Sequence, residues 1–370
     1  MRIEFFFGHA KIRMSELILV SETFSPETGW GTVANALAYE AERAGWHVIK
    51  VASDGTGSLG TPLVYKVSDG LWKRRKAASD WSDWIVNQPA KIVHFITEPQ
   101  FWLATRTKKI CVGTVHGTYA AVSAHGPIWS RFQFARGMDR LAKVAAVSAF
   151  TGRVVESRWK NKIIVIPNGL DRAITKEPRK EIGWQTGSDH RILHVGAIKR
   201  RKGCLELIKG FAEYAKSFDD AVLAMIGPIQ EGEYMEQIRK AIRSMGLENK
   251  IMLTGRVARD ELLAWYNWCH VMALLPINGQ SFEGFGLVYL EANAFGKPVL
   301  GLKKTAAEEA IGPQTGILAA SANPKDISEG LQSVLDQDRK WDFGSWLAEH
   351  SWENVFKKYQ EIYLSLSEKN

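Results

Sequence analysis

Two glutamates, Glu283 and Glu291, lie eight positions apart in the otherwise apolar segment SFEGFGLVYLEANAFGKPVL. A carboxylate in such a segment is expected to be buried, and burial of a charge is costly unless a partner offsets the loss of water. Gly284 and Gly286 argue against a helix at the start of the segment. We therefore expect a loop through SFEGFG, followed by a helix that begins near Leu287.

The start of this predicted helix offers free backbone N–H groups, which form a site for an anion. Helical side chains lean towards the N-terminus, so Glu291 in the second turn can reach the same region as Glu283. Carboxylates accept hydrogen bonds well from vicinal sugar hydroxyls. A nucleotide diphosphate sugar, with its ribose diol, diphosphate and sugar diol, fits this pair. The alternative is that one glutamate caps the helix and the other lies on the surface.

Short continuous apolar runs alternate with helical patterns in both halves of the chain, which is typical of parallel strands buried on both faces. The runs of the first half are LILVSE, HVIKVAS, IVHFITE, ICVGTVHG, VAAVSA and KIIVIPNG, and those of the second half begin with RILHVGA, AVLAMIG, KIMLTGRV and VMALLPI. The pattern predicts an α/β protein of two tandem Rossmann-like, doubly wound domains that face a central cleft. We expect the domains at residues 1–170 and 171–350, with a terminal helix at about 351–370 that packs back on the first domain. Ligands of such folds bind at the carboxyl ends of the strands.

The composition is that of a globular protein, with 370 residues, 45% hydrophobic and 24% charged. The three cysteines have neither disulfide nor zinc-site spacing, which indicates a reducing compartment. The sequence shows no apolar run long enough for a spanning helix and no signal-peptide pattern at its start. We therefore expect a cytoplasmic protein whose first 15 residues form a mobile extension.

The net charge of +8 is unevenly distributed. Residues 1–170 hold 22 Lys and Arg against 13 Asp and Glu, whereas residues 171–370 hold 26 against 27. The excess includes Lys73–Lys76 and Arg106–Lys109, and several tryptophans lie in the same half. Two interpretations stay open. The excess is either a solvated basic face or a surface for an anionic partner such as a membrane at which the protein is peripheral.

Several motifs in the order found here resemble those of the retaining, family 4-like glycosyltransferases of the GT-B fold (glycosyl transferases group 1). The Glu-x7-Glu segment is similar to the family's donor motif, and SPETGWGTVANALAYEAERAGWHV, TVHGTY, IPNGLD, VGAIKRRKG and LTGRVARDELLAWYNWCHVMALLP match further pieces. The resemblance covers roughly residues 15–365. Any single piece would be weak evidence, but the ordered combination is specific.

The resemblance implies roles for residues of the second half, which would hold the donor. Glu283 would contact hydroxyls of the transferred sugar, the Phe285–Leu287 backbone would contact the sugar and phosphate, and Glu291 would contact the ribose diol. Lys202 would hold the diphosphate, whose negative charge grows as the glycosidic bond breaks. The residues implied for donor binding are Gly29, Gly31, Arg201, Lys202, Val257, Glu283, Gly284, Phe285, Gly286, Leu287 and Glu291.

The chain departs from the family at one position, because Ala197 stands where many relatives carry arginine after glycine. Others carry the arginine directly before the lysine, which favours Arg201, and Lys199 and Arg200 are the alternatives. Trp30, between Gly29 and Gly31, also departs from the usual small or aliphatic residue. It could narrow the acceptor site or stack on a sugar.

The family's catalytic histidine corresponds to His116, which follows a strand, so the implied catalytic residues are His116, Glu283 and Lys202. His94, at the end of an earlier run, ranks lower, and Asn168 is interpreted as structural. The Asp336–Asp338 triplet resembles a metal-binding DxD, but no strand precedes it. We expect no metal site and no cofactor beyond the nucleotide-sugar substrate.

These observations predict a retaining hexosyltransferase that needs no metal and moves a sugar from a nucleotide diphosphate sugar to an acceptor hydroxyl. By family resemblance a UDP-sugar is favoured and GDP-mannose comes second. The acceptor would be a glycan, a glycolipid or a small sugar, and no nucleic acid is expected. The alternatives are a sugar-phosphate-type synthase of the same fold and a non-catalytic binding subunit.

Overall fold

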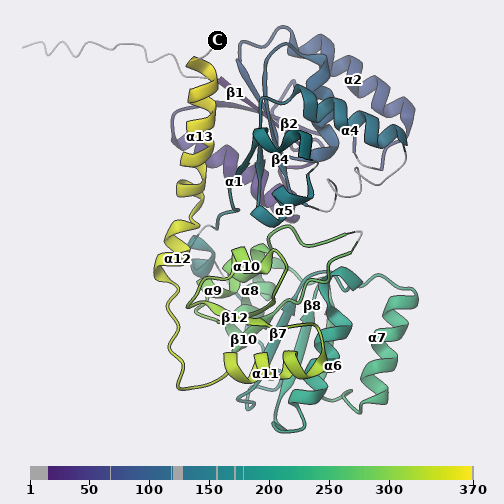
Figure 1. Ribbon diagram of the computed structural model, residues 1–370, viewed down its shortest axis with the longest axis vertical. Helices are drawn as coiled ribbons and strands as arrows, with labels where there is room; N and C mark the ends of the chain where they lie inside the picture. Colours follow the sequence, from purple (N-terminus) through teal and green to yellow (C-terminus); the bar gives the residue numbers. More distant parts are fainter. Residues whose placement is uncertain are drawn as a thin grey trace, which may run out of the picture.

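The computed structural model describes residues 16–368 except positions 67, 118, 120–127, 156, 171, 178 and 280. The expected extension at residues 1–15 lies outside the described residues. The chain forms two lobes stacked along its long axis, each with a parallel six-stranded sheet, and a C-terminal helix runs along one side (Figure 1). The predicted fold class of two doubly wound α/β domains is confirmed.

The sheet of the first domain has the order β2-β1-β3-β4-β5-β6, and all its neighbours are parallel. Its strands are β1 (Glu16–Ser21), β2 (His47–Ala52), β3 (Ile92–Phe95), β4 (Ile110–Val115), β5 (Lys143–Ala146) and β6 (Ile163–Val165). The strands are short and almost wholly buried at the centre of the sheet, because helices cover both faces. The order reverses between β1 and β3, which opens a crevice at their carboxyl ends.

Helices connect these strands as parallel pairing requires. They are α1 (Gly29–Arg43), α2 (Leu71–Ile85), α4 (Ile128–Arg140), α5 (Ala149–Val154) and the 3₁₀ segments η1 (Glu98–Arg106), η2 (Ser157–Lys162) and η3 (Arg172–Lys176). In α1, the buried side chains Val33, Ala34, Leu37, Ala38 and Ala41 follow the helical period and pack on the sheet. Both α2 and α4 contact η1 on the outer side of the domain.

The second domain has the sheet order β12-β11-β10-β7-β8-β9, again parallel. Its strands are β7 (Arg191–Val195), β8 (Val222–Ile226), β9 (Ile251–Gly255), β10 (Val271–Ala273), β11 (Val299–Leu302) and β12 (Gly316–Ala319). Its helices are η4 (Arg200–Lys202), α6 (Cys204–Tyr214), α7 (Glu233–Ser244), α8 (Arg259–Trp268), α9 (Leu287–Ala294), α10 (Ala307–Ala310) and α11 (Pro324–Val334). The order reverses between β7 and β10, so the loops after these two strands meet at the cleft.

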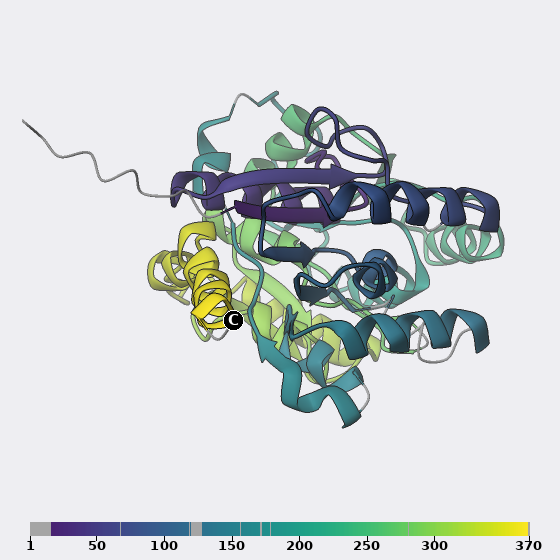
Figure 2. The ribbon, with the colours of Figure 1, turned by 90° about the horizontal axis from the view of Figure 1, so that it is seen from above.

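After α11 the chain crosses back to the first domain through α12 (Gly344–Glu349) and α13 (Trp352–Glu368). The buried face of α13 carries Val355, Phe356, Tyr359, Ile362 and Tyr363 at helical spacing, and it belongs to the same apolar cluster as β1 and α1. Figure 2 shows α13 beside the first domain, on the side opposite α2 and α4.

His94 lies inside β3 and not at its end, and it anchors this terminal helix. Its ring bonds the Tyr363 hydroxyl at 2.7 Å and the Thr114 hydroxyl at 2.8 Å, and the side chain is fully buried. Burial lowers the pKa of His94 to about 3, so the ring is neutral. The lower rank given to His94 as a functional residue agrees with this structural position.

Asp336 and Asp338 lie in the turn after α11, where the Asp338 amide donates to the Asp336 carboxylate at 3.1 Å. Within the described parts of the chain, no group of three His, Cys, Asp or Glu side chains could hold a metal ion. Within the same residues, no helix combines the length and apolar character that a bilayer crossing requires.

Candidate functional site

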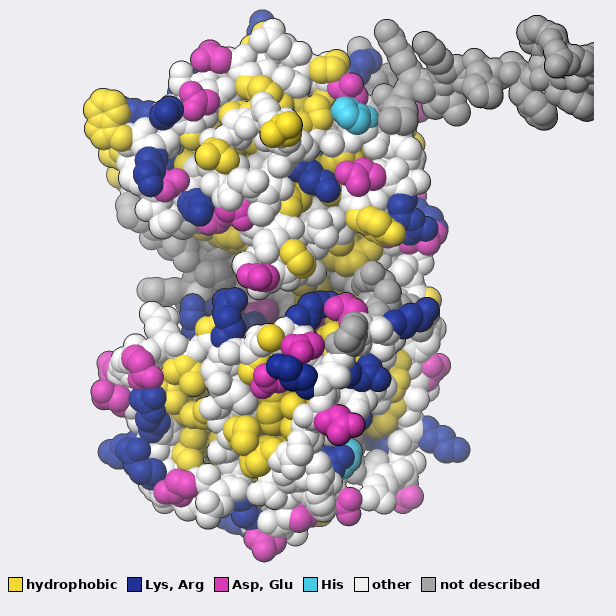
Figure 3. Space-filling view, turned by 180° about the vertical axis from the view of Figure 1, so that it is seen from behind, with side chains coloured by type: hydrophobic (Ala, Val, Ile, Leu, Met, Phe, Trp, Pro, Cys, Tyr) yellow, Lys and Arg dark blue, Asp and Glu magenta, His cyan; other side chains and the backbone are white. Residues whose placement is uncertain are grey.

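A cavity of about 810 Å³ lies between the two domains, at the carboxyl ends of the central strands. The first domain lines it with the loop after β1, the start of α1 and the ends of β3 and β4. The second domain lines it with the turn after β7 and the loop before α9. Figure 3 shows the hollow between the lobes, with Lys and Arg side chains gathered along the edge of the lower, second domain.

Glu283 is the carboxylate on which two cations converge. Lys202 Nζ lies 2.7 Å from Glu283 Oε2, and Arg201 Nη1 donates to the same oxygen. The Lys202 and Glu283 side chains are only 11% and 15% exposed. Burial opposes the ionisation of Glu283, but Lys202 and Arg201 outweigh it and hold the pKa of Glu283 below its usual range.

The local backbone explains how both cations reach this carboxylate. Residues Arg200–Lys202 form a single 3₁₀ turn that ends at Gly203, whose φ of +66° is left-handed. A side chain at Gly203 would clash with the Leu275 carbonyl oxygen, 1.9 Å from its Cβ position. The turn aims Arg201 and Lys202 into the cavity. Arg200 instead lies over the Tyr234 ring at 4.9 Å, and Lys199 does not line the cavity.

The loop SFEGFG does lead into a helix, α9, that begins at Leu287. No side chain caps this helix, and Gly284, Phe285, Gly286 and Leu287 line the cavity at its start. An uncapped helix start that faces a cavity binds anions through its N–H groups and its dipole. The two cations and this helix start therefore surround one region of positive potential.

Glu291 and Glu283 line different cavities. Glu291 faces a second cavity of about 580 Å³, and Leu287 lines both. The Tyr266 hydroxyl donates to Glu291 at 2.5 Å. Burial raises the pKa of Glu291, while the bond from Tyr266 and the nearby Arg259 oppose that rise. Val257 packs against the core of the second domain and lines neither cavity.

The first domain contributes the start of α1 to the cavity that is also lined by Glu283 and other residues of its loop, residues 281–286 (the donor loop). Thr28 caps the helix by accepting a hydrogen bond from the Gly31 amide at 3.1 Å. Gly29 and Trp30 line the main cavity, whereas Gly31 does not. Asn168 also lines this cavity from the end of β6.

His116 lies at the end of β4 and lines the cavity, as the strand-end rule predicts. Its Nε2 bonds the Ile96 carbonyl oxygen at 2.8 Å. Burial lowers the pKa of His116 to about 4, so the ring is neutral at pH 7 and Nε2 carries the hydrogen. This leaves Nδ1 as an acceptor. The His116 carbonyl oxygen faces Gly284, where a Cβ atom would lie only 1.7 Å from it.

Glu98 is a cavity residue that the sequence motifs did not single out. Its Oε1 accepts hydrogen bonds from the His116 amide at 2.7 Å and the Gly117 amide at 3.2 Å. Its side chain is buried, and its Oε2 has no hydrogen-bond partner among the described residues. Burial raises the pKa of Glu98 to about 7, although the two amides favour the charged form. The strand-end rule could have found it, because it directly follows IVHFIT.

A second group that the motifs missed joins the two domains at the donor loop. The Ser148 hydroxyl donates to the Gly284 carbonyl at 2.7 Å, and the Thr151 hydroxyl donates to it at 3.2 Å. From the other side, the Glu309 carboxylate in α10 accepts hydrogen bonds from the amides of Ala149 and Phe150, the latter at 2.7 Å. Glu309 thus caps α5, a helix of the other domain.

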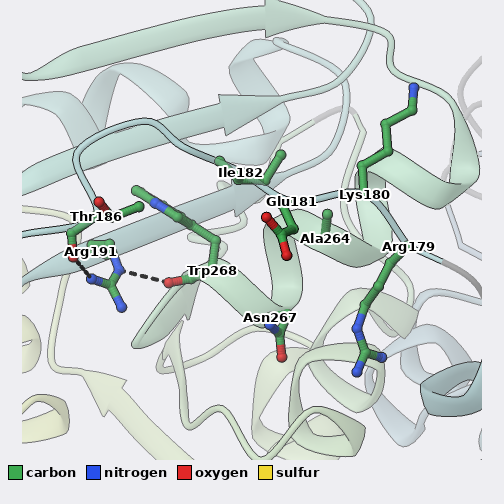
Figure 4. A pocket seen from close by; sticks show the side chains of 9 residues that line it. All are labelled: Arg179, Lys180, Glu181, Ile182, Thr186, Arg191, Ala264, Asn267 and Trp268. Atoms are coloured by element: carbon green, nitrogen blue, oxygen red, sulfur yellow. Dashed lines mark hydrogen bonds between the residues drawn. The ribbon is translucent and has the colours of Figure 1, made fainter.

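A third cavity, of about 480 Å³, lies on the second domain between α8 and the segment 179–191 (Figure 4). Its cations are already engaged. Arg191 donates to the Thr186 and Trp268 carbonyl oxygens at 2.7 Å, and Lys180 lies 3.6 Å from Asp260. This third cavity contains none of the motif residues, so we place the site in the cavity between the two domains.

Comparison with known proteins identifies the family of the chain. Residues 176–342 match the family described as glycosyl transferases group 1, and residues 28–173 match the one described as glycosyltransferase family 4. The chain belongs to glycosyltransferase family 4. It is a nucleotide-sugar glycosyltransferase.

The curated proteins that are similar to this chain in sequence include two kinds of enzyme. It is 26% identical over 268 residues to the GDP-mannose-dependent alpha-(1-6)-phosphatidylinositol monomannoside mannosyltransferase of Mycobacterium tuberculosis, covering 66% of this chain and 68% of that protein. It is 27% identical over 208 residues to the D-inositol 3-phosphate glycosyltransferase of Corynebacterium urealyticum, covering 54% of this chain and 48% of that protein.

Solved structures show the same fold at low identity. Anabaena HepE in complex with UDP-glucose matches with a TM-score of 0.74 and 15% identity, covering 95% of this chain and 99% of that one. The sucrose-phosphate synthase of Thermosynechococcus elongatus matches with a TM-score of 0.74 and 17% identity, covering 96% and 100%. These likenesses establish the GT-B architecture of this family 4 glycosyltransferase.

The buried Glu98 carboxyl predicts a pH-dependent stability. Its pKa is about 7 in the folded protein and near 4.5 in the unfolded chain. Its contribution is therefore fully present below pH 4.5 and is lost as the pH rises through 7. Relative to Glu98→Gln, the wild type should lose up to about 3 kcal/mol of unfolding free energy across that window. Denaturant unfolding of both proteins at several pH values measures this difference, and parallel pH profiles would contradict it.

The Glu309 contact predicts a role in holding the domains together. Glu309→Ala leaves the two α5 amides without their carboxylate, at a cost of about 1–3 kcal/mol to the closed arrangement. We expect a larger radius of gyration in solution scattering and weaker donor binding. Glu308→Ala is the matched control, because Glu308 contacts the Lys304 amide within its own domain. Identical scattering curves for Glu309→Ala and wild type would exclude this role.

Proposed function

We propose that this family 4 enzyme is a retaining glycosyltransferase that transfers a sugar from a nucleotide diphosphate sugar, held by the second domain, to an acceptor hydroxyl held by the first. The observation that carries the proposal is the convergence of Lys202 and Arg201 on buried Glu283 beside the uncapped start of α9. A diphosphate supplies the anion that the two cations and the helix start can share. Glu283 is then released to accept hydrogen bonds from hydroxyls of the transferred sugar.

The reaction needs stabilisation of the leaving diphosphate more than it needs a protein nucleophile. The bond from the anomeric carbon to the diphosphate oxygen breaks, and its electron pair leaves with the diphosphate. The acceptor oxygen bonds to the same face of that carbon, and its proton passes to the departing phosphate oxygen. Lys202 and Arg201 stabilise the growing negative charge. We propose that these two cations serve in place of a metal ion.

His116 completes the site from the first domain. Its carbonyl oxygen packs against Gly284 and can stabilise positive charge at the anomeric carbon. Its neutral ring offers Nδ1 to a hydroxyl of the substrate. Glu291 and the second cavity suit the ribose diol of the nucleotide. Gly29, at the start of α1, lets the backbone of the first domain approach the donor phosphates.

Two donors have support from relatives. A UDP-sugar donor is supported by HepE, which shares this fold and whose structure holds UDP-glucose. A GDP-mannose donor is supported by the name of the mycobacterial relative. A sugar-phosphate-type synthase has the fold's likeness to sucrose-phosphate synthase in its favour. A non-catalytic subunit is the weaker alternative, because the buried ion cluster of Glu283 is intact.

The outer face of the first domain supports an acceptor at a membrane surface. On α2, Trp72 is 85% exposed beside Lys73, Arg75 and Lys76, and on α4 the exposed Ile128, Trp129 and Phe132 surround Arg131. Both helices contact η1, so the two groups of exposed side chains lie on helices of the same part of the domain. Exposed aromatic and aliphatic side chains among cations suit an anionic lipid surface. We therefore propose a glycolipid or lipid-linked glycan acceptor for a peripheral enzyme.

The donor site makes a quantitative prediction. A nucleotide at 100 times its dissociation constant should stabilise the protein by about 2.7 kcal/mol. We expect a thermal shift with one of UDP, GDP or ADP that is lost in Lys202→Ala and in Glu291→Ala. Glu283→Ala should lower turnover at least ~10²-fold, because the sugar loses its reactive orientation. Glu329→Ala, on the exposed face of α11, is the control. Turnover of Glu283→Ala equal to wild type would refute the assigned role.

The membrane surface is tested by vesicle sedimentation. Binding to vesicles that contain phosphatidylglycerol should exceed binding to pure phosphatidylcholine and should weaken as salt rises. The double variant Arg75→Glu, Lys76→Glu should bind several-fold less, about as expected from two reversed charges at an anionic surface. Lys240→Glu, Arg243→Glu on exposed α7 is the matched control. Equal binding of all three proteins would count against this surface.

A further inference from the structure

The two sides of the interdomain cleft carry opposite charge. The second domain contributes Arg201 and Lys202 to the cavity, whereas Lys66 is the one cation among the described residues of the first domain that line it. On that same side four carboxyl groups line the cavity: Glu22, Glu27, Asp54 and Glu98. The acceptor side of the cleft is therefore acidic, although the first domain as a whole is basic.

Two of these carboxyl groups, Asp54 and Glu98, are held by hydrogen bonds from the first domain. Asp54 accepts hydrogen bonds from the Thr56 amide at 3.0 Å and the Thr56 hydroxyl at 2.5 Å. Burial opposes its ionisation, but bonds from Thr23 and Thr56 hold the pKa of Asp54 below its usual range. Glu98 is 2% exposed and lines the cavity, and its Oε2 has no partner among the described residues. A buried acceptor without a partner at a cavity wall indicates a ligand that brings a donor.

Aromatic side chains complete this side. Trp30 lies in the first turn of α1, is partly buried and lines the cavity, as does Tyr119. A tryptophan offers a flat apolar face for the C–H side of a sugar ring and attracts a cationic group by its π-electrons. Carboxylates beside it accept hydrogen bonds from hydroxyl or ammonium groups. The same carboxylates repel a phosphate, which proteins bind with Arg and Lys.

We propose that the first-domain side of the cleft takes a sugar unit that carries no phosphate, held by hydroxyl or ammonium donors on Glu27, Asp54 and Glu98 with Trp30 beneath its ring. This inference rests on the proposed function, since it names the acceptor class of that site. It also separates two roles for charge on the first domain. An anionic carrier lies on the outer basic face, and the reacting sugar enters an acidic pocket. The acidic pocket disfavours a sugar-phosphate-type synthase.

The test measures binding directly, so it does not depend on turnover. Ligand-observed saturation-transfer NMR is recorded with methyl α-D-glucopyranoside and glucosamine, and with glucose 6-phosphate and glucosamine 6-phosphate. The spectra are recorded first with UDP and then with GDP in excess, so that the phosphate groups of the sugars cannot occupy the donor site. We expect signal from the two sugars without phosphate and at least about tenfold weaker binding of the phosphorylated ones, as one nearby like charge would produce.

Two variants make the result specific to this pocket. Trp30→Ala should abolish the signal of the unphosphorylated sugars. Glu27→Lys with Asp54→Lys should weaken glucosamine and strengthen glucose 6-phosphate. The proposal is overturned if wild type binds the phosphorylated sugars equally well or better, if no sugar binds, or if the charge reversal changes nothing.

Donor hydrolysis without acceptor, measured on the same samples, reports the proposed function separately. If the wild type does not hydrolyse the donor but still prefers sugars without phosphate, the proposed transfer is refuted and the proposed acceptor class is retained. Intact hydrolysis with reversed selectivity would refute the acceptor class alone.

Discussion

A single buried carboxylate, Glu283, sets the requirements that the rest of the site satisfies. Its charge is stable in a mostly buried position because Lys202 and Arg201 reach it from the turn after β7. That turn exists because Gly203 adopts a left-handed conformation against the Leu275 carbonyl. Two cations on one carboxylate leave a net positive charge in the cavity that the start of α9 also lines.

The donor loop that carries Glu283 belongs to one domain but is positioned by both. Ser148 and Thr151 bind the Gly284 carbonyl, and His116 packs so closely that no side chain fits at Gly284. In the opposite direction, Glu309 of the second domain accepts hydrogen bonds from the first amides of α5 in the first domain. Because the loop is held from both sides, opening of the cleft must release it.

Charge is sorted within the first domain by location. The cations of α2 and α4 point outward among exposed aromatic side chains, while the cleft side of the domain carries carboxylates. A net charge per domain hides this division, since it sums both surfaces. Under the proposed function, this separation would let one domain meet an anionic surface and still hold a sugar without phosphate next to the donor.

Local sequence determined the strands, the helices and the principal charges of the site. Continuous apolar runs predicted two parallel sheets, and glycine spacing predicted the loop before α9. The resemblance of KRRKG to a family motif implied that Lys202 and Arg201 hold the diphosphate, and the structure places both cations on Glu283. His116 and Glu98 both follow strands, so the strand-end rule predicts both as site residues. The sequence motifs pointed only to His116.

Tertiary structure decided the contacts between residues far apart in the chain. Sequence spacing suggested that Glu283 and Glu291 converge, whereas the fold turns them into neighbouring cavities on either side of Leu287. His94 reads as a strand-end residue, but Tyr363, 269 positions away, makes it an anchor for α13. No local sequence pattern predicts the contact of Glu309 with α5, and none predicts the acidic wall of the cleft. These features depend on how two domains pack, and packing brings together side chains whose separation in sequence carries no information about their distance in space.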